Sequence, residues 1–271
     1  MDANWIIPAF VMIDTLMEHL EHQSDPRAQV PDSAIVTVAG VAAKDFAHHH
    51  ERAVQVMNGM GYLSGRISVS RCTRRLHALR DWLAFIAVTV GELLTQGAVF
   101  VLDSRPAPVC RRARARRCRK VRGRAYCGYC SAKNEQCFGW RLHLIGTPQG
   151  APVTFQRAPA GFHDLTPIHQ LAFARPEGAR LFGDKAYNAA ADEQTIQAET
   201  GVRLVPGRKA TMGPHAWVLD DWELREDRHT IETVNRQLAK MGRERLHART
   251  NSGLELKVHA SLIALAFTNV D

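Results

Sequence analysis

The chain lacks a hydrophobic run long enough to cross a membrane. A transmembrane helix needs about 20 apolar residues, and the longest late apolar stretch, residues 82–94, is shorter and contains Glu92. A secretory signal is also missing, because the start of the chain has no basic residues and its short apolar run is interrupted by Pro8. We therefore expect a cytoplasmic protein without a membrane partner.

The chain contains only six cysteines among 271 residues. Small secreted domains that depend on disulfides are much richer in cysteine, so we expect reduced thiols. Cys127 and Cys130 have the CxxC spacing of a zinc ligand pair, and Cys118 and Cys137 flank them. A second CxxC or HxxxH pair is missing, and the same segment has strand character, which suits cysteines in a core. Both interpretations stay open for Cys127 and Cys130.

Acidic residues are almost absent between residues 104 and 145, where 12 Lys and Arg residues accompany a single acid, Glu135. The whole chain has a net charge of +8, so this segment carries the entire basic surplus. Clustered Lys and Arg release counterions from nucleic-acid phosphates, which gives salt-sensitive and largely sequence-independent binding. A solvated loop without a partner is the alternative. We predict DNA binding by the densest part, namely Arg111, Arg112, Arg114, Arg116, Arg117, Arg119, Lys120, Arg122 and Arg124.

Residues 1–95 have the apolar periodicity of helices. The clearest helix is expected to begin at Ser70, because serine is a favourable N-cap residue. Its apolar seam consists of Leu76, Leu79, Leu83 and Ile86. Arg71, Arg74 and Arg75 lie mostly away from that seam, which is typical of a helix that contacts DNA. We predict a small helical N-terminal region over residues 1–95 that contributes to DNA binding.

From residue 97 onward, short strands and helices alternate. Strands are expected at residues 98–102, 138–145, 151–156, 180–182 and 202–205, and helices near residues 163–173, 189–200, 227–241 and 254–268. Three strands followed by alternating helices and strands is the order of a ribonuclease-H-like domain. We therefore predict an α/β fold over residues 96–271, with a mixed five-stranded sheet in which strand one pairs with strand four.

Three acidic residues are expected to converge on that sheet. Asp103 and Asp184 each follow an apolar strand, and their strand ends are neighbours if strands one and four pair. Glu232 lies in a helix-like stretch that is expected to pack on the same sheet. Carboxylates are the ligands that hard divalent ions prefer, and two such ions roughly 3.5–4 Å apart support phosphodiester chemistry. We predict that Asp103, Asp184 and Glu232 hold two Mg²⁺ or Mn²⁺ ions, with Asp103 bridging both.

Several motifs resemble those of the DDE transposases of bacterial insertion sequences. The matching blocks are residues 101–106, 140–145, 161–164, 183–187 and 228–234. The resemblance implies a ribonuclease-H-like catalytic domain with Asp103, Asp184 and Glu232 as the catalytic triad. It also implies that Arg228 lies near DNA phosphates, and Lys185 and Lys240 are further candidates for DNA contact.

Two positions depart from the family pattern. The tyrosine expected three residues before Arg228 is Arg225, and the lysine expected seven residues after Glu232 is Ala239, with Lys240 next. We expect a transposase that cuts element ends and joins them to target DNA. Such a protein would act as a homodimer on double-stranded DNA at the bacterial nucleoid. A nuclease or resolvase of the same fold is one alternative, and a non-catalytic DNA-binding regulator or relic is the other.

Overall fold

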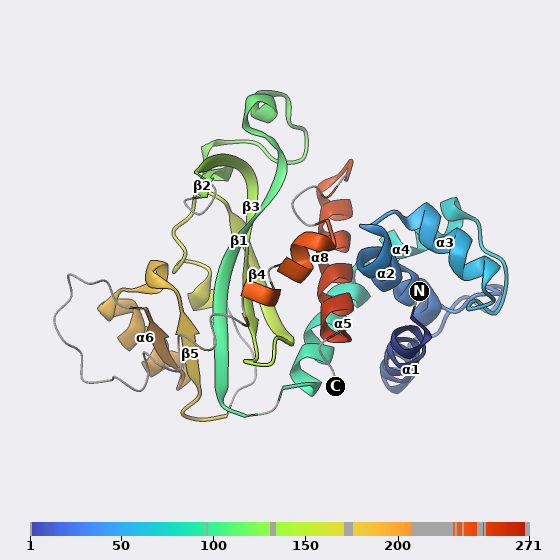
Figure 1. Ribbon diagram of the computed structural model, residues 1–271, viewed down its shortest axis with the longest axis horizontal. Coiled ribbons are helices and arrows are strands. Elements are labelled where there is room, and N and C mark those ends of the chain that lie inside the picture. Colours follow the sequence, from blue (N-terminus) through green and yellow to red (C-terminus); the bar gives the residue numbers. More distant parts are fainter. Residues whose placement is uncertain are drawn as a thin grey trace. The chain divides into compact units, whose positions relative to one another are not determined.

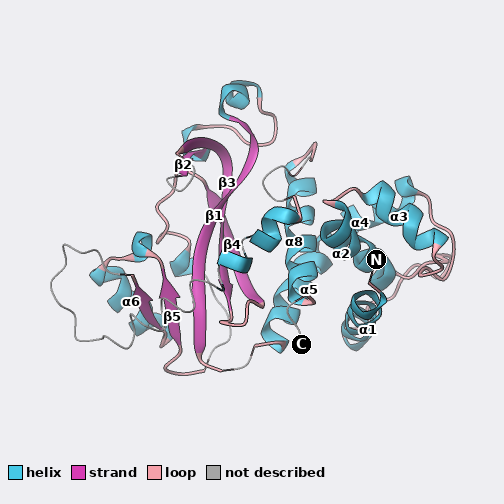
Figure 2. Ribbon diagram, viewed as in Figure 1, coloured by secondary structure: helices cyan, strands magenta, loops and turns pink. Residues whose placement is uncertain are grey.

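The computed structural model describes residues 2–95, 97–130, 134–170, 176–207, 230, 232–234, 236–242, 246 and 248–268. The chain forms two compact units (Figure 1). The first comprises Met1–Val90 and Gln237–Asp271, and the second comprises Gly91–Arg236. Figure 2 shows that the described strands all belong to the second unit, so we call the first the helical unit and the second the sheet unit.

The helical unit is built around two buried helices. Its elements are α1 (Ala3–His19), α2 (Asp32–Phe46), α3 (His50–Gly59), α4 (Val69–Ala78), most of α5 (Arg80–Leu93) and α8 (Asn251–Ala266). Helices α2 and α8 pack against each other, and most residues of both are buried. A helix that is apolar on all sides is stable only in such a central position. The last helix was expected with the sheet, and instead it packs among the N-terminal helices.

The helix predicted from Ser70 differs in two respects. Its N-cap is Ser68, whose hydroxyl accepts a hydrogen bond from the backbone N–H of Arg71 at 3.3 Å. The helical run is also divided at Leu79, so that α4 and α5 follow each other as separate helices. The predicted apolar seam is nonetheless buried, at Leu76, Leu79, Leu83 and Ile86.

The sheet unit contains six strands among the residues described. They are β1 (Val99–Arg111), β2 (Cys127–Cys130), β3 (Glu135–Gly146), β4 (Pro152–Pro159), β5 (Arg180–Gly183) and β6 (Arg203–Pro206). Their order is β2-β3-β1-β5-β6, and β4 also pairs with β3. Strand β1 is parallel to β5, β5 is parallel to β6, and the other pairs are antiparallel. The ribonuclease-H-like prediction is confirmed, and β2 is an additional strand.

Strand β1 is longer than predicted. It was expected to end at Leu102, yet it continues to Arg111 because β3 remains its partner along that whole length. The parallel pairing with β5 is shorter and ends at Leu102, opposite Gly183. Asp103 therefore lies inside β1, at the first residue beyond the parallel pairing with β5.

The helix predicted for residues 163–173 is wrong in its described part. Residues 164–167 form turns, and only the short 3₁₀ helix η4 (Ile168–Gln170) follows. The ring Nδ1 of His163 accepts a hydrogen bond from the backbone N–H of Leu165 at 3.4 Å, which stabilises the turn. The next prediction is confirmed, because α6 (Ala190–Thr200) ends at Gly201, which has a φ of 68°.

Each face of the sheet carries its own hydrophobic cluster. Phe100 and Leu102 belong to the larger cluster, together with Ile196 of α6. Val101 and Phe182 form the core of a smaller cluster. Successive side chains of a strand point to opposite faces, so the two faces of β1 differ along its length. This alternation decides on which side the functional side chains lie.

Candidate active site

Asp103 and Asp184 adjoin each other in the register of the sheet. Each follows directly after the last parallel pair of β1 and β5, which is Leu102 and Gly183. Alternation along the strands assigns both aspartates to the face that carries Val101 and Phe182. The two carboxylates therefore belong to neighbouring strands and to one side of the sheet.

Hydrogen bonds hold both of these aspartates. The carboxylate of Asp103 accepts from Nε of Arg105 at 3.0 Å and from the backbone N–H of Ser104 at 2.8 Å. The carboxylate of Asp184 accepts from the backbone N–H of Ala186 at 2.9 Å, where it caps the 3₁₀ helix η5 (Lys185–Tyr187). Such bonds fix the orientation of each carboxylate before any ligand binds.

A third carboxylate, Asp164, lies on the opposite face. It accepts from Oγ of Ser104 at 3.1 Å and from Nη1 of Arg141 at 2.6 Å. Ser104 pairs with His143 across β1 and β3, and residues directly opposite each other share one face. Since Ser104 and Asp103 are consecutive, Asp164 approaches the strand from the side away from Asp103. The sequence indicated a helix start at Asp164 within a motif block shared with transposases, but its partners, Ser104 and Arg141, are distant in the chain.

Tyr187 is the buried centre of this arrangement. Its hydroxyl is 3.2 Å from Nδ1 of His143. Burial raises the pKa of Tyr187 well above its usual value, and the negative charges of Asp164, Asp103 and Asp184 raise it further. Burial also lowers the pKa of His143 to about 4, so this ring is neutral at neutral pH. The carboxylates thus create a region of negative potential around two neutral side chains.

Glu232 is in helical residues, as predicted, and its side chain is 47% exposed. Its Oε2 lies 3.8 Å from Nη2 of Arg236 in an ion pair along the helix. No group of three or more His, Cys, Asp or Glu side chains surrounds a single point in the described part of the chain. The sheet register places Asp103 and Asp184 directly after neighbouring strand positions, and the position of Glu232 relative to them stays a prediction. The paired aspartates offer the oxygen donors that a hard divalent ion prefers, so their chemistry fits such an ion.

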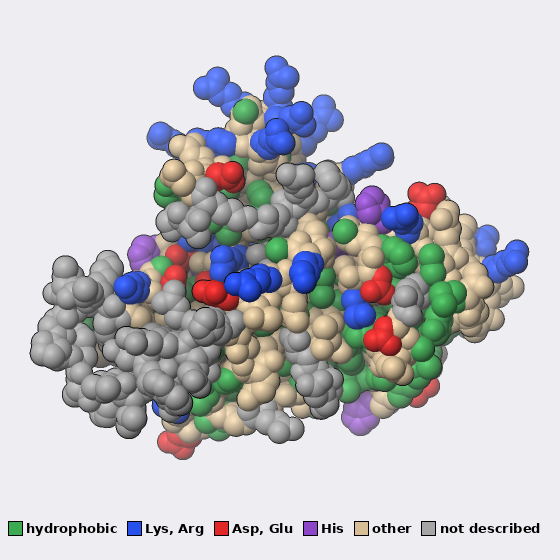
Figure 3. Space-filling model, viewed as in Figure 1, with side chains coloured by type: hydrophobic (Ala, Val, Ile, Leu, Met, Phe, Trp, Pro, Cys, Tyr) green, Lys and Arg blue, Asp and Glu red, His purple; other side chains and the backbone are tan. Residues whose placement is uncertain are grey.

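The predicted DNA-binding segment is an exposed basic surface. It includes the 3₁₀ helices η1 (Arg112–Arg117) and η2 (Arg124–Tyr126). All of its predicted arginines are exposed, whereas Lys120 is half-buried and its Nζ donates to the carbonyl oxygen of Val109 at 3.0 Å. Lys and Arg side chains gather at the upper end of the sheet unit in Figure 3, where Figure 1 draws this segment. Exposed guanidinium groups of this density suit a polyanionic partner.

The other three candidates for DNA contact differ in how far they are described. Lys185 directly follows Asp184 and is exposed. Lys240 is exposed in a helical stretch that belongs to the helical unit. Arg228 lies outside the described residues.

The cysteines do not assemble a zinc site within the described residues. All six are free thiols. Cys127 and Cys130 are the ends of β2, where they pair with Phe138 and Glu135 of β3. No three potential ligands come together in this part of the molecule, so strand pairing accounts for these two cysteines.

The sheet order and the adjoining aspartates of β1 and β5 define a ribonuclease-H-like domain of the DDE class. A family model described as "Transposase DDE domain" matches residues 94–252, which is more than half of the chain, and the chain belongs to this family. No curated protein and no solved structure matches the chain significantly.

Membership in this family assigns a transposase-type function to the chain, in transposition and DNA recombination with DNA as the substrate. Domains of this family generally use divalent metal ions. Within the described residues, no helix combines the length and the apolar character that crossing a membrane requires.

Proposed function

We propose that this protein is an insertion-sequence transposase that cuts the ends of its element and joins the freed 3′ ends to target DNA. One observation carries the proposal. In a chain of the transposase DDE family, Asp103 and Asp184 directly follow the last parallel pair of β1 and β5 on one face of the sheet. In-line displacement at phosphorus needs carboxylates so arranged, because they hold the ions that offset the developing negative charge.

Asp103, Asp184 and Glu232 would hold two ions of Mg²⁺ or Mn²⁺. Such ions, when bound, activate the attacking oxygen and stabilise the leaving oxygen. The residues of the chain orient the carboxylates. Arg105 and the backbone of Ser104 hold Asp103, and Asp164 in turn holds the hydroxyl of Ser104. Asp164 is therefore a positioning residue that acts on the carboxylate of Asp103 through Ser104.

Binding of double-stranded DNA is proposed to involve both units. The basic segment, residues 111–124, provides salt-sensitive affinity, with Lys185, Arg228 and Lys240 as further contacts. The helical N-terminal region is proposed to bind the ends of the element. Two ends must be held at once, so we propose a homodimer on DNA, located at the nucleoid of a bacterium.

The test is a Mg²⁺-dependent cleavage assay on duplexes that contain the inverted repeats flanking the gene. We expect Asp103→Asn and Asp184→Asn to abolish nicking while DNA binding persists. Glu199→Gln is the matched control, because Glu199 is an exposed carboxylate of α6 in the same unit. Nicking by Asp184→Asn at the wild-type rate would overturn the catalytic assignment. Cleavage without joined products would instead identify a nuclease or resolvase.

A non-catalytic regulator derived from such a transposase is the second candidate. The observation in its favour is that the described residues do not gather three carboxylates around one point, and that Ala239 stands where the family has a lysine. This candidate predicts metal-independent binding to the same repeats without any strand break. The cleavage assay therefore decides between the two.

A further inference from the structure

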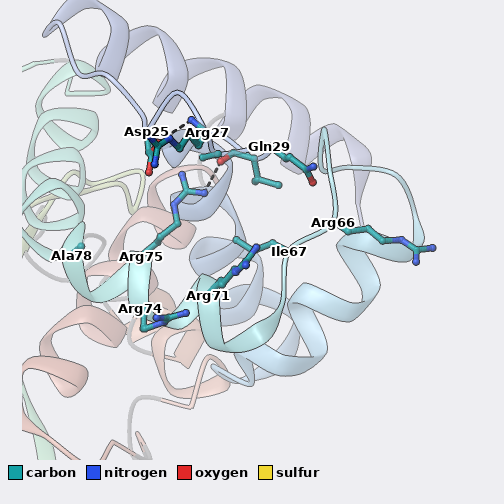
Figure 4. Close-up of a pocket in the computed structure, with 11 residues that line it drawn as sticks. Asp25, Arg27, Gln29, Arg66, Ile67, Arg71, Arg74, Arg75 and Ala78 are labelled. Atoms are coloured by element: carbon teal, nitrogen blue, oxygen red, sulfur yellow. Dashed lines mark hydrogen bonds between the residues drawn. The ribbon is translucent and has the colours of Figure 1, made fainter.

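The helical unit contains a pocket of about 500 Å³ that is unusually rich in arginine (Figure 4). Three segments that are distant in the chain line it: the loop after α1, the loop before α4, and α4 itself. The basic residues among its lining are Arg27, Arg66, Arg71, Arg74 and Arg75. We call this the arginine pocket. It is formed entirely by the helical unit and is separate in sequence from the basic segment of the sheet unit.

Arg75 is the structural member of the arginine pocket. Its Nε donates to Oδ1 of Asp32 at 2.9 Å, and its Nη1 donates to the carbonyl oxygen of Val30 at 2.6 Å. Figure 4 shows its side chain reaching from α4 to the loop after α1. The charge of Arg75 is therefore neutralised by Asp32, and its bonds hold two walls of the pocket at a defined separation.

The other four arginines are exposed and have no ion pair among the residues that the structure describes. The only acid in the lining is Asp25, whose carboxylate accepts from the backbone N–H of Arg27 at 2.9 Å. In Figure 4, the side chains of Arg71 and Arg74 lie beside α4, and Arg66 points outward, away from them. Four positive charges gathered beside a single carboxylate repel each other, and an anionic ligand relieves that repulsion.

We propose that the arginine pocket binds the phosphate backbone of double-stranded DNA, with Arg71 and Arg74 as the principal contacts. This inference rests on the proposed function, and it names the residues by which the helical unit would hold an element end. Guanidinium groups match phosphate oxygens in geometry and remain charged at any physiological pH. A backbone suits the pocket better than a single free phosphate, because its exposed arginines come from three separate segments and Arg66 points away from Arg71 and Arg74.

The experiment measures DNA affinity of the full chain against salt concentration, with duplexes that contain or lack the inverted repeat. Each phosphate contact contributes roughly 0.9 to the slope of log affinity against log salt. We expect Arg71→Ala with Arg74→Ala to lower the slope by about 1 to 2 on both duplexes, since phosphate contacts are insensitive to sequence. Arg71→Lys with Arg74→Lys should keep most of the slope because the charges remain.

The matched control removes two arginines of the same unit that do not line the pocket. Arg52 of α3 and Arg80 of α5 are both exposed, and the double change Arg52→Ala with Arg80→Ala alters the net charge equally. If both double variants lower the slope equally, the pocket proposal is overturned, while salt-sensitive binding by the wild type leaves the proposed function standing. If the wild type binds no duplex at all, the proposed function itself fails.

Inorganic phosphate distinguishes a DNA site from a site for a small anion. Thermal stabilisation by phosphate that Arg71→Ala with Arg74→Ala abolishes, together with unchanged DNA affinity, would overturn the proposal in favour of a small-anion site. Circular dichroism of each variant establishes that its helices are intact, and the lysine variant keeps the comparison valid if the alanine variant fails to fold.

Discussion

The two units of this molecule present arginine in different ways. In the sheet unit, the basic residues are consecutive in sequence, exposed, and placed on short 3₁₀ helices beyond the end of a long strand. In the helical unit, α4 brings three arginines to one pocket and each of two loops brings one, and Arg75 braces the pocket through Asp32. A run of arginines that are close in sequence is visible in the composition of that segment. A pocket lined by arginines from separate segments depends on how those segments pack. The sequence therefore indicated the whole basic segment, whereas for the pocket it indicated only the arginines of α4.

The largest expected effect comes from the basic segment. Changing Arg114, Arg116, Arg117 and Arg119 together to alanine should lower the salt slope of DNA binding by about 3 to 4, since each lost contact removes roughly 0.9. The same titration that tests the arginine pocket measures it. A slope no lower than that of Arg52→Ala with Arg80→Ala would show that the segment is only a solvated surface.

The next largest effect is expected at low pH, which should destabilise the two units to different extents. Burial lowers the pKa of His48 to about 3 and of His50 to about 4 in the helical unit, and of His143 to about 4 in the sheet unit. Below the usual pKa of 6.5, the unfolded chain binds protons that the folded chain does not. Stability is therefore full above pH 6.5 and falls as the pH drops toward 4. Each of these histidines contributes a loss of up to about 1.4 kcal/mol for every pH unit in that range.

The helical unit has two such histidines and should open first. Hydrogen exchange at pH 7, 5.5 and 4.5, followed separately for peptides of each unit, measures this order. His48 bonds to Ser261 of α8 with Nε2 and Oγ 2.9 Å apart, so His48→Gln is the variant that tests the cause. It should flatten the pH dependence of the helical unit alone. Equal loss of protection in both units at pH 4.5 would contradict the prediction.

A smaller effect is expected from Asp164→Asn in the sheet unit, which should lower the rate of DNA nicking without changing DNA affinity. Asp164→Asn removes the charge that orients Ser104 and Arg141, and through Ser104 the carboxylate of Asp103. Residues that orient metal-binding carboxylates typically contribute about 10- to 100-fold to activity or metal affinity. We expect a loss of that size in nicking with DNA affinity unchanged. Asp192→Asn, which removes an exposed partner of His169, is the control and should nick normally.

The smallest expected effect is on the brace of the arginine pocket. Asp32→Asn weakens a half-buried, charge-assisted pair with Arg75, so the free energy of unfolding should fall by about 1–3 kcal/mol. Urea denaturation monitored by circular dichroism measures it. Asp81→Asn breaks the exposed pair with Arg80 and should change stability much less. Equal losses in the two variants would show that Asp32 does not brace the pocket.

Local features of the fold were predictable because they depend on neighbouring residues. All five expected strands are present, and α6 ends at Gly201 as predicted. The extension of β1 past Leu102 was not predictable, since its later residues include Pro106 and Pro108 and stay extended because β3 pairs with them. The turns at residues 164–167 replaced a predicted helix for a similar reason, because Asp164 is held by Ser104 and Arg141.

In the candidate site, too, some features were predictable from the sequence and others depend on contacts between distant residues. The sequence indicated Asp103 and Asp184 because each follows an apolar strand within a recognisable motif. Asp164 and Arg141 also lie in motif blocks, but the sequence did not indicate their contacts, which join residues 60 and 23 positions apart in the chain. A polar residue that acts through a distant partner leaves no periodic signal.

The sequence by itself determined where the chain alternates with the period of a strand or of a helix, where its basic charge is concentrated, and which motif blocks it shares with transposases. Those properties are local, since side-chain period and charge density do not depend on distant contacts. Only the tertiary structure decided that α8 packs with α2, and that α4 and the loop after α1 enclose the arginine pocket. Each of these depends on burial and hydrogen bonding between segments far apart in the chain, and that energy exists only in the folded state.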